Sequence, residues 1–462
     1  EDERFSPIAD SYWNARGGSY ADGGAFTFTV TDGDRGVRCT DKFGREVTLE
    51  ANVAGSNGRR RAVVVSRANG RGGTEAVAPG PGSNGTAMPP AAGVARAAAA
   101  AGRFLRRTED RARCGGPERA AAFEILASIA DGQRRWPGLR PSRFLAMADE
   151  TLGRVADGVR QGPCDAFGFF AAGEEATGGA LGRTLVIDAR GFPVDGPRSL
   201  ARELVALRAL GWARFVVVGA RGHRFLGCGF GPAAAGVHLE VFGAPGDYLA
   251  SGIDGVDVVV HGDGQDQLAQ IMKDGRLVVH GNVGQTFLYA AKGGRIYVRG
   301  SAGGRALINA VGQPRVVVNG TCLDYLAESF MAGDPHRGGG FVVLNGVAAT
   351  EDGGWMDLDP PYAGGNLFSL PSGGCVFVRD PRGRLDEAQL NGGSFAPVAA
   401  ADWRLLVPLL RENEALFGVS VEGLLTHDGV RRSPEQVYRK IVPAATRALQ
   451  AEEAWVANGR QG

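Results

Sequence analysis

The chain has 462 residues, of which 22% are charged, and a formal net charge of +1. This balance excludes a strong general attraction to nucleic acid or to a membrane surface. The length predicts two or more domains. Because no run of 18 apolar residues occurs, we expect no membrane span and assign the chain to the cytoplasm.

Six cysteines are scattered along the chain without any C-x-x-C pair. Their spacing fits neither zinc nor iron–sulfur sites, so the sequence predicts no metal and no cofactor on this chain. Disulfides are not expected in a long chain without a secretory leader. The 73 glycines fit stacked coils with sharp corners, and they also fit flexible linkers.

The first 180 residues divide into three predicted segments. Residues 1–68 alternate apolar and polar side chains between Asp-Gly and Phe-Gly turns, which predicts a small antiparallel β module. Residues 69–102 are rich in Gly, Ala and Pro, so we expect a flexible linker. Residues 103–180 carry two stretches of helical periodicity around Gly138 and Pro141, which predicts a helical hairpin that packs on the β-helix or on another subunit.

A strand, a helix and a second strand are predicted at residues 184–188, 199–210 and 215–218. The glycines that follow, Gly219 and Gly222, match neither the dinucleotide fingerprint nor the G-x-x-x-x-G-K-[ST] loop. We therefore expect no nucleotide site, and we interpret this segment as the lead-in to the next domain.

Residues 243–346 repeat one short pattern. Each repeat ends in a glycine at a step of 19, 19, 19 and 20 residues, at Gly243, Gly262, Gly281, Gly300 and Gly320. A strand with apolar alternate residues, such as Val258 and Val260, precedes each of these glycines and must face a shared interior. Such a step predicts stacked coils. The predicted fold of residues 181–385 is a right-handed parallel β-helix in a mainly β chain.

Glycine recurs at the corners of the coils, where a residue free to take a positive φ is suited to a sharp turn. Gly255, Gly275 and Gly294 precede strands and are interpreted in this way. The predicted structural turn glycines at and after the repeat ends are Gly243, Gly246, Gly262, Gly281, Gly284, Gly300, Gly303 and Gly320.

The outer face of the predicted strands carries mostly polar side chains, which stacking aligns into ladders. The positive charge predicts a docking face for an anionic ligand or an acidic partner surface, and a solvated face is the alternative. The candidate docking residues are Arg276, His280, Arg295, Arg299 and Arg315. His261 and His280 could share a metal, but the sequence places no third ligand beside them, and no nucleophile with a base and an acid can be assembled.

The coils continue less regularly beyond Gly320, to a last rung at residues 373–380. The spacing of the acidic residues in the preceding loop does not fit an EF-hand, so we interpret the loop as solvated; they are Asp352, Asp357 and Asp359. Residues 386–462 are predicted to form a helical cap, with helices from Asp402 and Ser433 that fold over the open end of the stack.

The glycine repeats, together with the lead-in at residues 184–227, resemble the glycine-repeat β-helix at the C-terminus of the glutamate synthase large subunit. A similar domain forms the glycine-repeat subunit of formylmethanofuran dehydrogenase. The resemblance covers about residues 180–380. It implies a non-catalytic scaffold or assembly subunit of a glutamate synthase-like complex in nitrogen metabolism, because nothing in the chain resembles the glutaminase or flavin-binding parts.

The same resemblance implies the partners. Other protein subunits would carry flavin and iron–sulfur cofactors, and a homo-oligomer is the alternative assembly. Two other functions stay open at this point. One is a subunit of a formylmethanofuran dehydrogenase-like or formyltransferase-like complex, and the other is an enzyme that binds its substrate in a groove along the β-helix.

Overall fold

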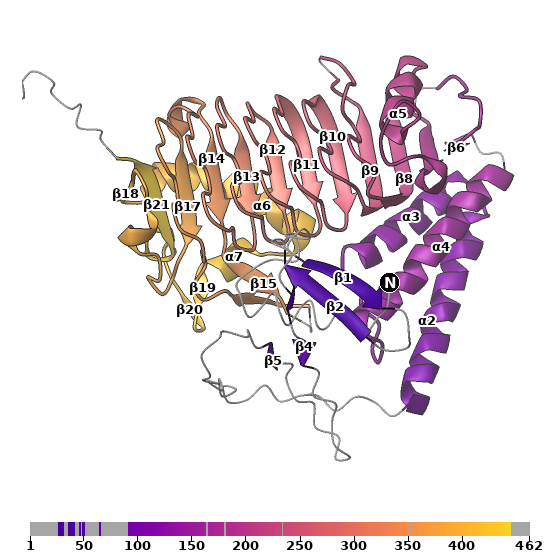
Figure 1. The fold of residues 1–462 in the computed structure, drawn as a ribbon, viewed down its shortest axis with the longest axis horizontal. Helices are drawn as coiled ribbons and strands as arrows, with labels where there is room; N and C mark the ends of the chain where they lie inside the picture. Colours follow the sequence, from indigo (N-terminus) through magenta and orange to yellow (C-terminus); the bar gives the residue numbers. More distant parts are fainter. Residues whose placement is uncertain are drawn as a thin grey trace, which may run out of the picture. The chain divides into compact units, whose positions relative to one another are not determined.

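The computed structural model describes residues 91–162, 165–179, 182–232, 234–350 and 353–444, and the backbone of short strands between residues 26 and 65. The chain divides into two units. The first comprises Glu1–Ala176, Gly182–Gly191 and Val216–Ala220, and the second comprises Thr177–Leu181, Phe192–Phe215 and Arg221–Gly462. Figure 1 labels their helices and strands.

The first unit contains short antiparallel strands, three helices and a parallel strand pair. The antiparallel pairs are β1 (Phe26–Thr31) with β2 (Gly36–Asp41), β2 with β3 (Glu46–Val47), and β4 (Leu49–Glu50) with β5 (Val64–Val65). The parallel pair is β6 (Phe167–Ala171) with β7 (Thr184–Asp188). The helices are α2 (Ala91–Ala112), α3 (Gly116–Ala130) and α4 (Pro141–Gln161).

The predicted linker over residues 69–102 is wrong from Ala91 onward, where α2 begins. The prediction counted the Gly, Ala and Pro of the whole segment together. It therefore overlooked that alanine, unlike glycine and proline, is the strongest helix former. Ala101 and Leu105 are buried at 0% and 1% exposure, so α2 packs as a third helix beside the predicted pair. Residues 69–90 lie outside the described part of the chain.

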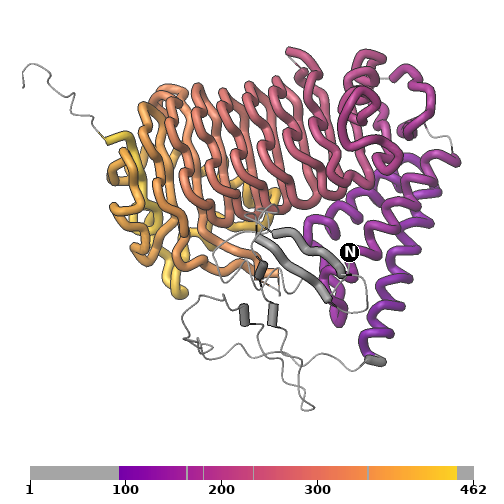
Figure 2. Tube along the Cα trace, in the orientation of Figure 1, coloured from indigo at the N-terminus to yellow at the C-terminus, as the bar shows by residue number. Residues whose placement is uncertain are grey.

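The second unit is a stack of parallel coils, which confirms the predicted β-helix. Val260 pairs in register with Val279, Val279 with Val298, and Val298 with Val318. Figure 2 shows the successive coils side by side. The parallel strands are β9 (His238–Ala244), β10 (Asp254–His261), β11 (Asp274–Val279), β12 (Arg295–Val298), β13 (Arg315–Val318), β14 (Phe341–Leu344) and β17 (Cys375–Arg379).

The lead-in elements lie where the sequence predicts them. After β7, helix α5 spans Leu200–Ala209 and β8 spans Arg214–Arg221. The helix buries Leu200 and Leu204 at 0% exposure, as its apolar periodicity predicts. Gly219 and Gly222 lie within and just after β8, and no helix begins there.

Each coil also contains a segment in which every second residue is left-handed, and most of these residues are not glycine. In one coil, Gln267, Ala269 and Ile271 have φ values of 58°, 54° and 54°. The alternation flips successive peptide groups. The amide of Gln267 donates to Gln285 of the next coil and that of Ala269 donates to Leu249 of the previous one. These bonds offset a left-handed cost of roughly 1–2 kcal/mol per residue.

Positive φ explains only part of the predicted turn glycines. Gly243 and Gly262 have positive φ values of 113° and 145°. Gly255, Gly275 and Gly294 also have positive φ values, of 88°, 112° and 94°. The prediction of positive φ is wrong for Gly246, Gly284 and Gly303, and the repeat-end glycines Gly281, Gly300 and Gly320 do not have positive φ either.

Those six glycines are required by close approach between coils. A Cβ at Gly281 would lie 2.3 Å from Asp263 Oδ1 and 2.6 Å from the carbonyl oxygen of Gly262. The Asp263 carboxylate is in place because it accepts a hydrogen bond from the amide of Asn282, at 2.6 Å. Stacked coils with strands about 4.8 Å apart leave no room there for a side chain.

The C-terminal segment covers the stack differently from the prediction. Helix α6 (Ala400–Phe417) packs on the outer face of the parallel sheet. The helix predicted from Ser433 is wrong, because after a four-residue helix α8 (Pro434–Val437) the chain forms β21 (Tyr438–Pro443). Tyr438 and Ile441, three residues apart and therefore on opposite faces of the strand, are both buried, at 2% and 0% exposure.

Strands therefore close the edge of the stack. β21 pairs antiparallel with β17 on one side and with β18 (Gly393–Ala396) on the other. The remaining elements are β15 (Val347–Ala349), β16 (Trp355–Asp357), α7 (Val421–Leu424), β19 (Thr426–His427) and β20 (Val430–Arg431). None of the described helices is long and apolar enough to cross a lipid bilayer.

Candidate functional site

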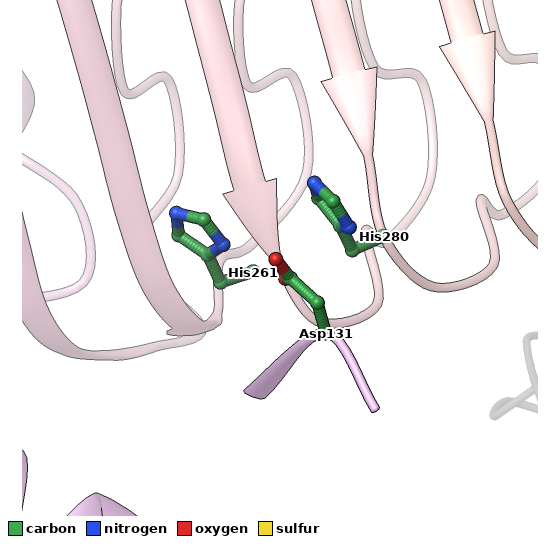
Figure 3. Close-up of side chains that lie close together, drawn as sticks. All are labelled: Asp131, His261 and His280. Atoms are coloured by element: carbon green, nitrogen blue, oxygen red, sulfur yellow. The ribbon is translucent and has the colours of Figure 1, made fainter. Parts of the chain in front are cut away.

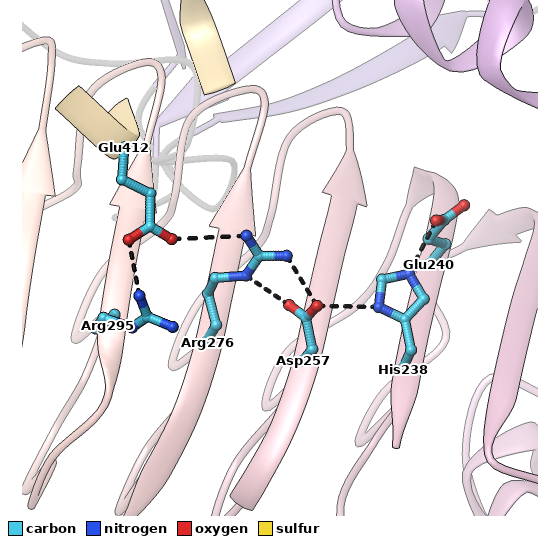
Figure 4. Close-up of polar contacts among 6 residues, drawn as sticks. All are labelled: His238, Glu240, Asp257, Arg276, Arg295 and Glu412. Atoms are coloured by element: carbon cyan, nitrogen blue, oxygen red, sulfur yellow. Dashed lines mark hydrogen bonds and ion pairs between the residues drawn. The ribbon is translucent and has the colours of Figure 1, made fainter. Parts of the chain in front are cut away.

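The outer face of the parallel sheet carries a row of alternating charges, drawn in Figure 4. Arg276 on β11 holds the Asp257 carboxylate of β10 with two hydrogen bonds of 2.8 Å. On the other side its guanidinium lies 3.6 Å from Glu412 of α6, which also accepts a 2.9 Å bond from Arg295. In-register stacking places Asp257 beside Arg276, whereas the like charges of Arg276 and Arg295 on successive coils are bridged by Glu412 from α6.

His238 on β9 extends this row by one coil. Its Nδ1 lies 3.1 Å from Asp257 and its Nε2 lies 2.9 Å from Glu240. Burial alone would lower the pKa of His238, but the hydrogen bonds to Asp257 and Glu240 outweigh it and raise the pKa to about 9. Both ring nitrogens therefore donate at neutral pH, and His238 acts as a cation.

Asp257 and Glu240 stay ionised in the row. Burial raises the pKa of Asp257, but the bonds from His238 and Arg276 outweigh burial and hold it well below its usual range. Burial raises the pKa of Glu240, but the His238 bond together with the nearby charges of His261, His238 and Arg214 outweighs it, so the pKa is lowered. The pKa of Arg276 is raised, first through its bond to Asp257. The row is an ion-pair network with charges balanced along its length.

Glu412 joins this network to helix α6. Its Oε2 also accepts a 2.7 Å hydrogen bond from the hydroxyl of Tyr297 on β12. The pKa of Tyr297 lies well above its usual value, because of burial first and the Glu412 carboxylate second. The phenol therefore stays protonated and remains a donor to Glu412.

The helix is held on the sheet by apolar packing. Leu406, Leu409, Leu410 and Phe417 are at most 6% exposed and pack against the outward side chains of the strands. The strand residues in this cluster include Val278, Tyr297, Val317, Val343 and Phe377. Burial of side chains of this size stabilises by about 1.5–3 kcal/mol each. The expectation that this face meets water or a partner is wrong along α6, because the chain covers it with its own helix.

A buried amide pair also fixes the helix. Asn319 and Asn413, both 0% exposed, donate to each other's side-chain oxygens at 2.8 and 2.9 Å. Asn345 on the next coil donates to Asn319 at 2.8 Å and accepts a 2.9 Å bond from Tyr438. The mutual bonds satisfy these buried amides and specify the position of α6 along the stack.

The candidate docking residues occupy different environments in the structure. Arg276 and Arg295 meet at Glu412. His280 contacts the edge of Phe417 with ring centroids 5.1 Å apart, and Arg299 lies 5.4 Å over the ring of Trp355. Arg315 is half-buried between Arg295 and Phe341 in the ladder. Arg276, Arg295 and Arg315 lie side by side on neighbouring strands, and the docking face stays a prediction.

His261 and His280 stack as predicted for successive coils, with ring centroids 5.4 Å apart (Figure 3). Phe242 stacks on the other face of His261 at 4.2 Å. Asp131, also labelled in Figure 3, belongs to the first unit. The expectation of no metal at the two histidines stays a prediction.

The acidic loop is tied down by arginines. Asp357 accepts a 2.6 Å bond from the buried Arg379 and lies 2.9 Å from His427. Asp359 pairs with Arg382 at 2.9 Å and with Arg384 at 3.2 Å. These contacts give both carboxylates side-chain partners, whereas Asp352 lies outside the described residues. The expectation that the loop binds no calcium stays a prediction.

Sequence reasoning missed His238, Glu240 and Glu412. A signal existed for the first two, because the strand HLEVFG ends in Gly243 like the later repeats and forms one more coil. Glu412 had no such signal, since it lies more than 100 residues from its arginine partners in a helix of its own.

A comparison with known proteins gives a family match in the coils. Residues 217–395 match the family described as GXGXG motif, which confirms the resemblance seen in the repeats. Comparison with curated proteins gives no significant match.

Proposed function

We propose that the chain is a non-catalytic scaffold of a glutamate synthase-like complex. The support is the match of residues 217–395 to the GXGXG motif, a β-helix domain found in glutamate synthase and related complexes. Catalytic subunits would dock on the β-helix. Glutamine-derived nitrogen chemistry would take place on those subunits, which would carry flavin and iron–sulfur cofactors.

One observation carries the proposal: the charged residues of the outer face are engaged with one another. Both nitrogens of His238 face carboxylates, so neither is available as a base. Arg276 contacts two partners within the network, and Glu412 contacts three. Such a network orients a helix on a sheet, which is the work of a scaffold.

The cysteines favour a reducing compartment. Cys114, Cys228, Cys322 and Cys375 are free thiols in the described part of the chain. Burial raises the pKa of Cys228 to about 11 and that of Cys322 to about 12, so these thiols are poor nucleophiles. This favours the cytoplasm as the place of assembly and a structural role for both side chains.

The test is native co-purification followed by an assay of the separated chain. We expect a stoichiometric flavin or iron–sulfur polypeptide in the native complex, and no turnover of glutamine, glutamate or a formyl substrate by the chain alone. Turnover by the separated chain would contradict the scaffold role and favour an enzyme with a groove along the coils. A formylmethanofuran dehydrogenase-like partner would support that alternative complex.

A further inference from the structure

A groove lies between two helices of the first unit, α2 and α4. Its volume is about 360 Å³, and each helix lines it with residues at i, i+3, i+4 and i+7, beginning at Gly102 and Met147. That spacing presents one continuous face of each helix over roughly 10 Å. Gly102, Leu105 and Met147 supply the apolar lining, and arginines and glutamates supply the charged lining.

The groove is open at Gly102 because this position has no side chain. A Cβ there would lie 3.4 Å from Arg106 Nη1 and 3.7 Å from Met147 Cε, which are ordinary contact distances, so packing does not require a glycine. Glycine inside a helix costs about 1 kcal/mol relative to alanine, and residues 97–101 before it are all alanine. The helix therefore forgoes helix propensity at a position where a methyl group would enter the groove.

The carboxylates of α2 are already bound. Glu109 accepts a 2.7 Å hydrogen bond from Arg154 and a 2.8 Å bond from Arg113, and its side chain is 13% exposed. Asp110 lies 3.7 Å from Arg113 as well. Both acidic side chains of α2 thus pair with arginines that lie outside this helix.

The exposed arginines of α2 are left without an acidic partner among the described residues; they are Arg103, Arg106, Arg107 and Arg111. Arg103, Arg107 and Arg111 follow one another at i and i+4, where like charges destabilise a helix by about 0.2–0.5 kcal/mol per pair. Arg106 lines the groove itself. In the described part of the chain, α2 therefore carries positive charge that nothing offsets, beside an opening with an apolar lining.

These two features together identify the class of ligand. A nucleic-acid backbone would meet the arginines but has no apolar side chain for the lining of the groove. A lipid surface requires large apolar side chains between the charges, whereas Ala99 and Ala100 precede Arg103. An amphipathic helix fits both features, because its apolar residues fill a groove while acidic residues flank them.

On the basis of the proposed scaffold function, we propose that the groove between α2 and α4 binds an acidic amphipathic helix of the partner polypeptide. An apolar side chain of that helix lies over Gly102, and its carboxylates pair with Arg103, Arg106 and Arg107. On the α4 side, Glu150 is 75% exposed and 4.0 Å from Arg154, so this side favours a neutral or basic residue of the occupant. The acidic edge of the occupant therefore faces α2.

The test is a titration of full-length variants with the partner polypeptide isolated from the native complex. Arg103→Glu/Arg106→Glu reverses two charges and should weaken binding by roughly tenfold or more at low salt, with a smaller salt dependence than in the wild type. Gly102→Leu fills the groove with a good helix former. It should also weaken binding by roughly tenfold, while the melting temperature stays constant or rises.

Two matched variants separate docking from folding and from total charge. Arg404→Glu makes the same charge reversal at an exposed position of α6. Gly158→Leu places the same side chain on α4 outside the groove lining, where nothing lies within 4 Å of the added Cβ. Neither variant should change the affinity, and an equal loss in Arg404→Glu would overturn the groove in favour of total charge.

The remaining outcomes distinguish the groove from the scaffold function. Undiminished affinity in both groove variants would overturn the groove and leave the scaffold function standing, whereas a wild-type chain without any partner would overturn the scaffold function itself. A homodimer that the groove variants dissociate would overturn the heterologous occupant in favour of a second copy of the chain. Binding of duplex DNA or of anionic lipid vesicles, lost in the arginine variant but kept in Gly102→Leu, would assign the arginines to those polyanions instead.

Discussion

The outer sheet face and the left-handed segments run along the same coils with the same period, but in the described part of the chain only the sheet face is covered by a helix. On the sheet face, α6 buries the outward strand residues and Glu412 neutralises two arginines. On the left-handed segments, outward side chains such as Gln267, Thr286 and Arg305 stay at least partly accessible. The charged residues of the outer sheet face bind one another and α6, whereas the outward side chains of the left-handed segments remain accessible.

This contrast shows what a repeat does and does not determine. The period aligns equivalent residues into ladders, so it fixes which side chains are neighbours. The period does not determine which segment covers a ladder, because the covering segment, here α6, lies outside the repeats and does not share their period. A basic ladder predicted from the repeat alone is therefore ambiguous until the acidic residues of the rest of the chain are placed.

The largest effect should come from the apolar anchor of α6. Leu410→Ala removes a side chain that is 0% exposed in the layer between helix and sheet. We expect a loss of about 2–5 kcal/mol in the free energy of unfolding, measured by urea denaturation. Leu405→Ala, at a partly buried position against the same cluster, is the control. Equal losses in both variants would show that α6 is not a packed layer.

The next effect concerns the approach of the coils. Gly281→Ala places a methyl group 2.3 Å from Asp263 Oδ1 and should destabilise by about 1–3 kcal/mol or more. Gly158→Ala in α4, where nothing lies within 4 Å of the added methyl group, should instead stabilise by up to about 1 kcal/mol. If Gly281→Ala melts at the wild-type temperature, close approach does not explain these glycines.

The difference between Gly281 and Gly158 shows which features of the fold could be predicted from the sequence and which could not. The 19-residue step was sufficient to predict the register of Val260 and Val279, because stacking follows directly from period and alternation. It could not show that Gly281 is required by a neighbouring carboxylate, since that contact depends on the coil above. Nor could it show left-handed Thr286, because propensity assigns such a φ to glycine. The partner of Arg295 lay outside the repeat altogether.

A third effect should appear as a pH dependence. The pKa of His238 is raised from 6.5 to about 9 in the fold, so its contribution is fully present below pH 6.5 and is lost as the pH rises through about 9. We expect the free energy of unfolding to fall by about 2 kcal/mol across this window, because solvent screens the partly exposed ion pairs of His238. The measurement is the unfolding free energy between pH 6 and about 10 for the wild type and His238→Gln. Parallel profiles for the two proteins would rule out a protonated His238.

The smallest effect should come from the exposed end of the ion-pair row. The Arg295 side chain is 55% exposed, so its bond to Glu412 is screened by solvent, and Arg295→Ala should cost no more than about 1 kcal/mol. Tyr297→Phe removes the buried hydroxyl from the same carboxylate and should cost more, about 1–2 kcal/mol. Both losses would be read from denaturant midpoints at low and high salt, and only that of Arg295→Ala should shrink with salt. A larger cost for Arg295→Ala than for Tyr297→Phe would mean that surface charge, rather than the covered layer, holds α6 on the coils.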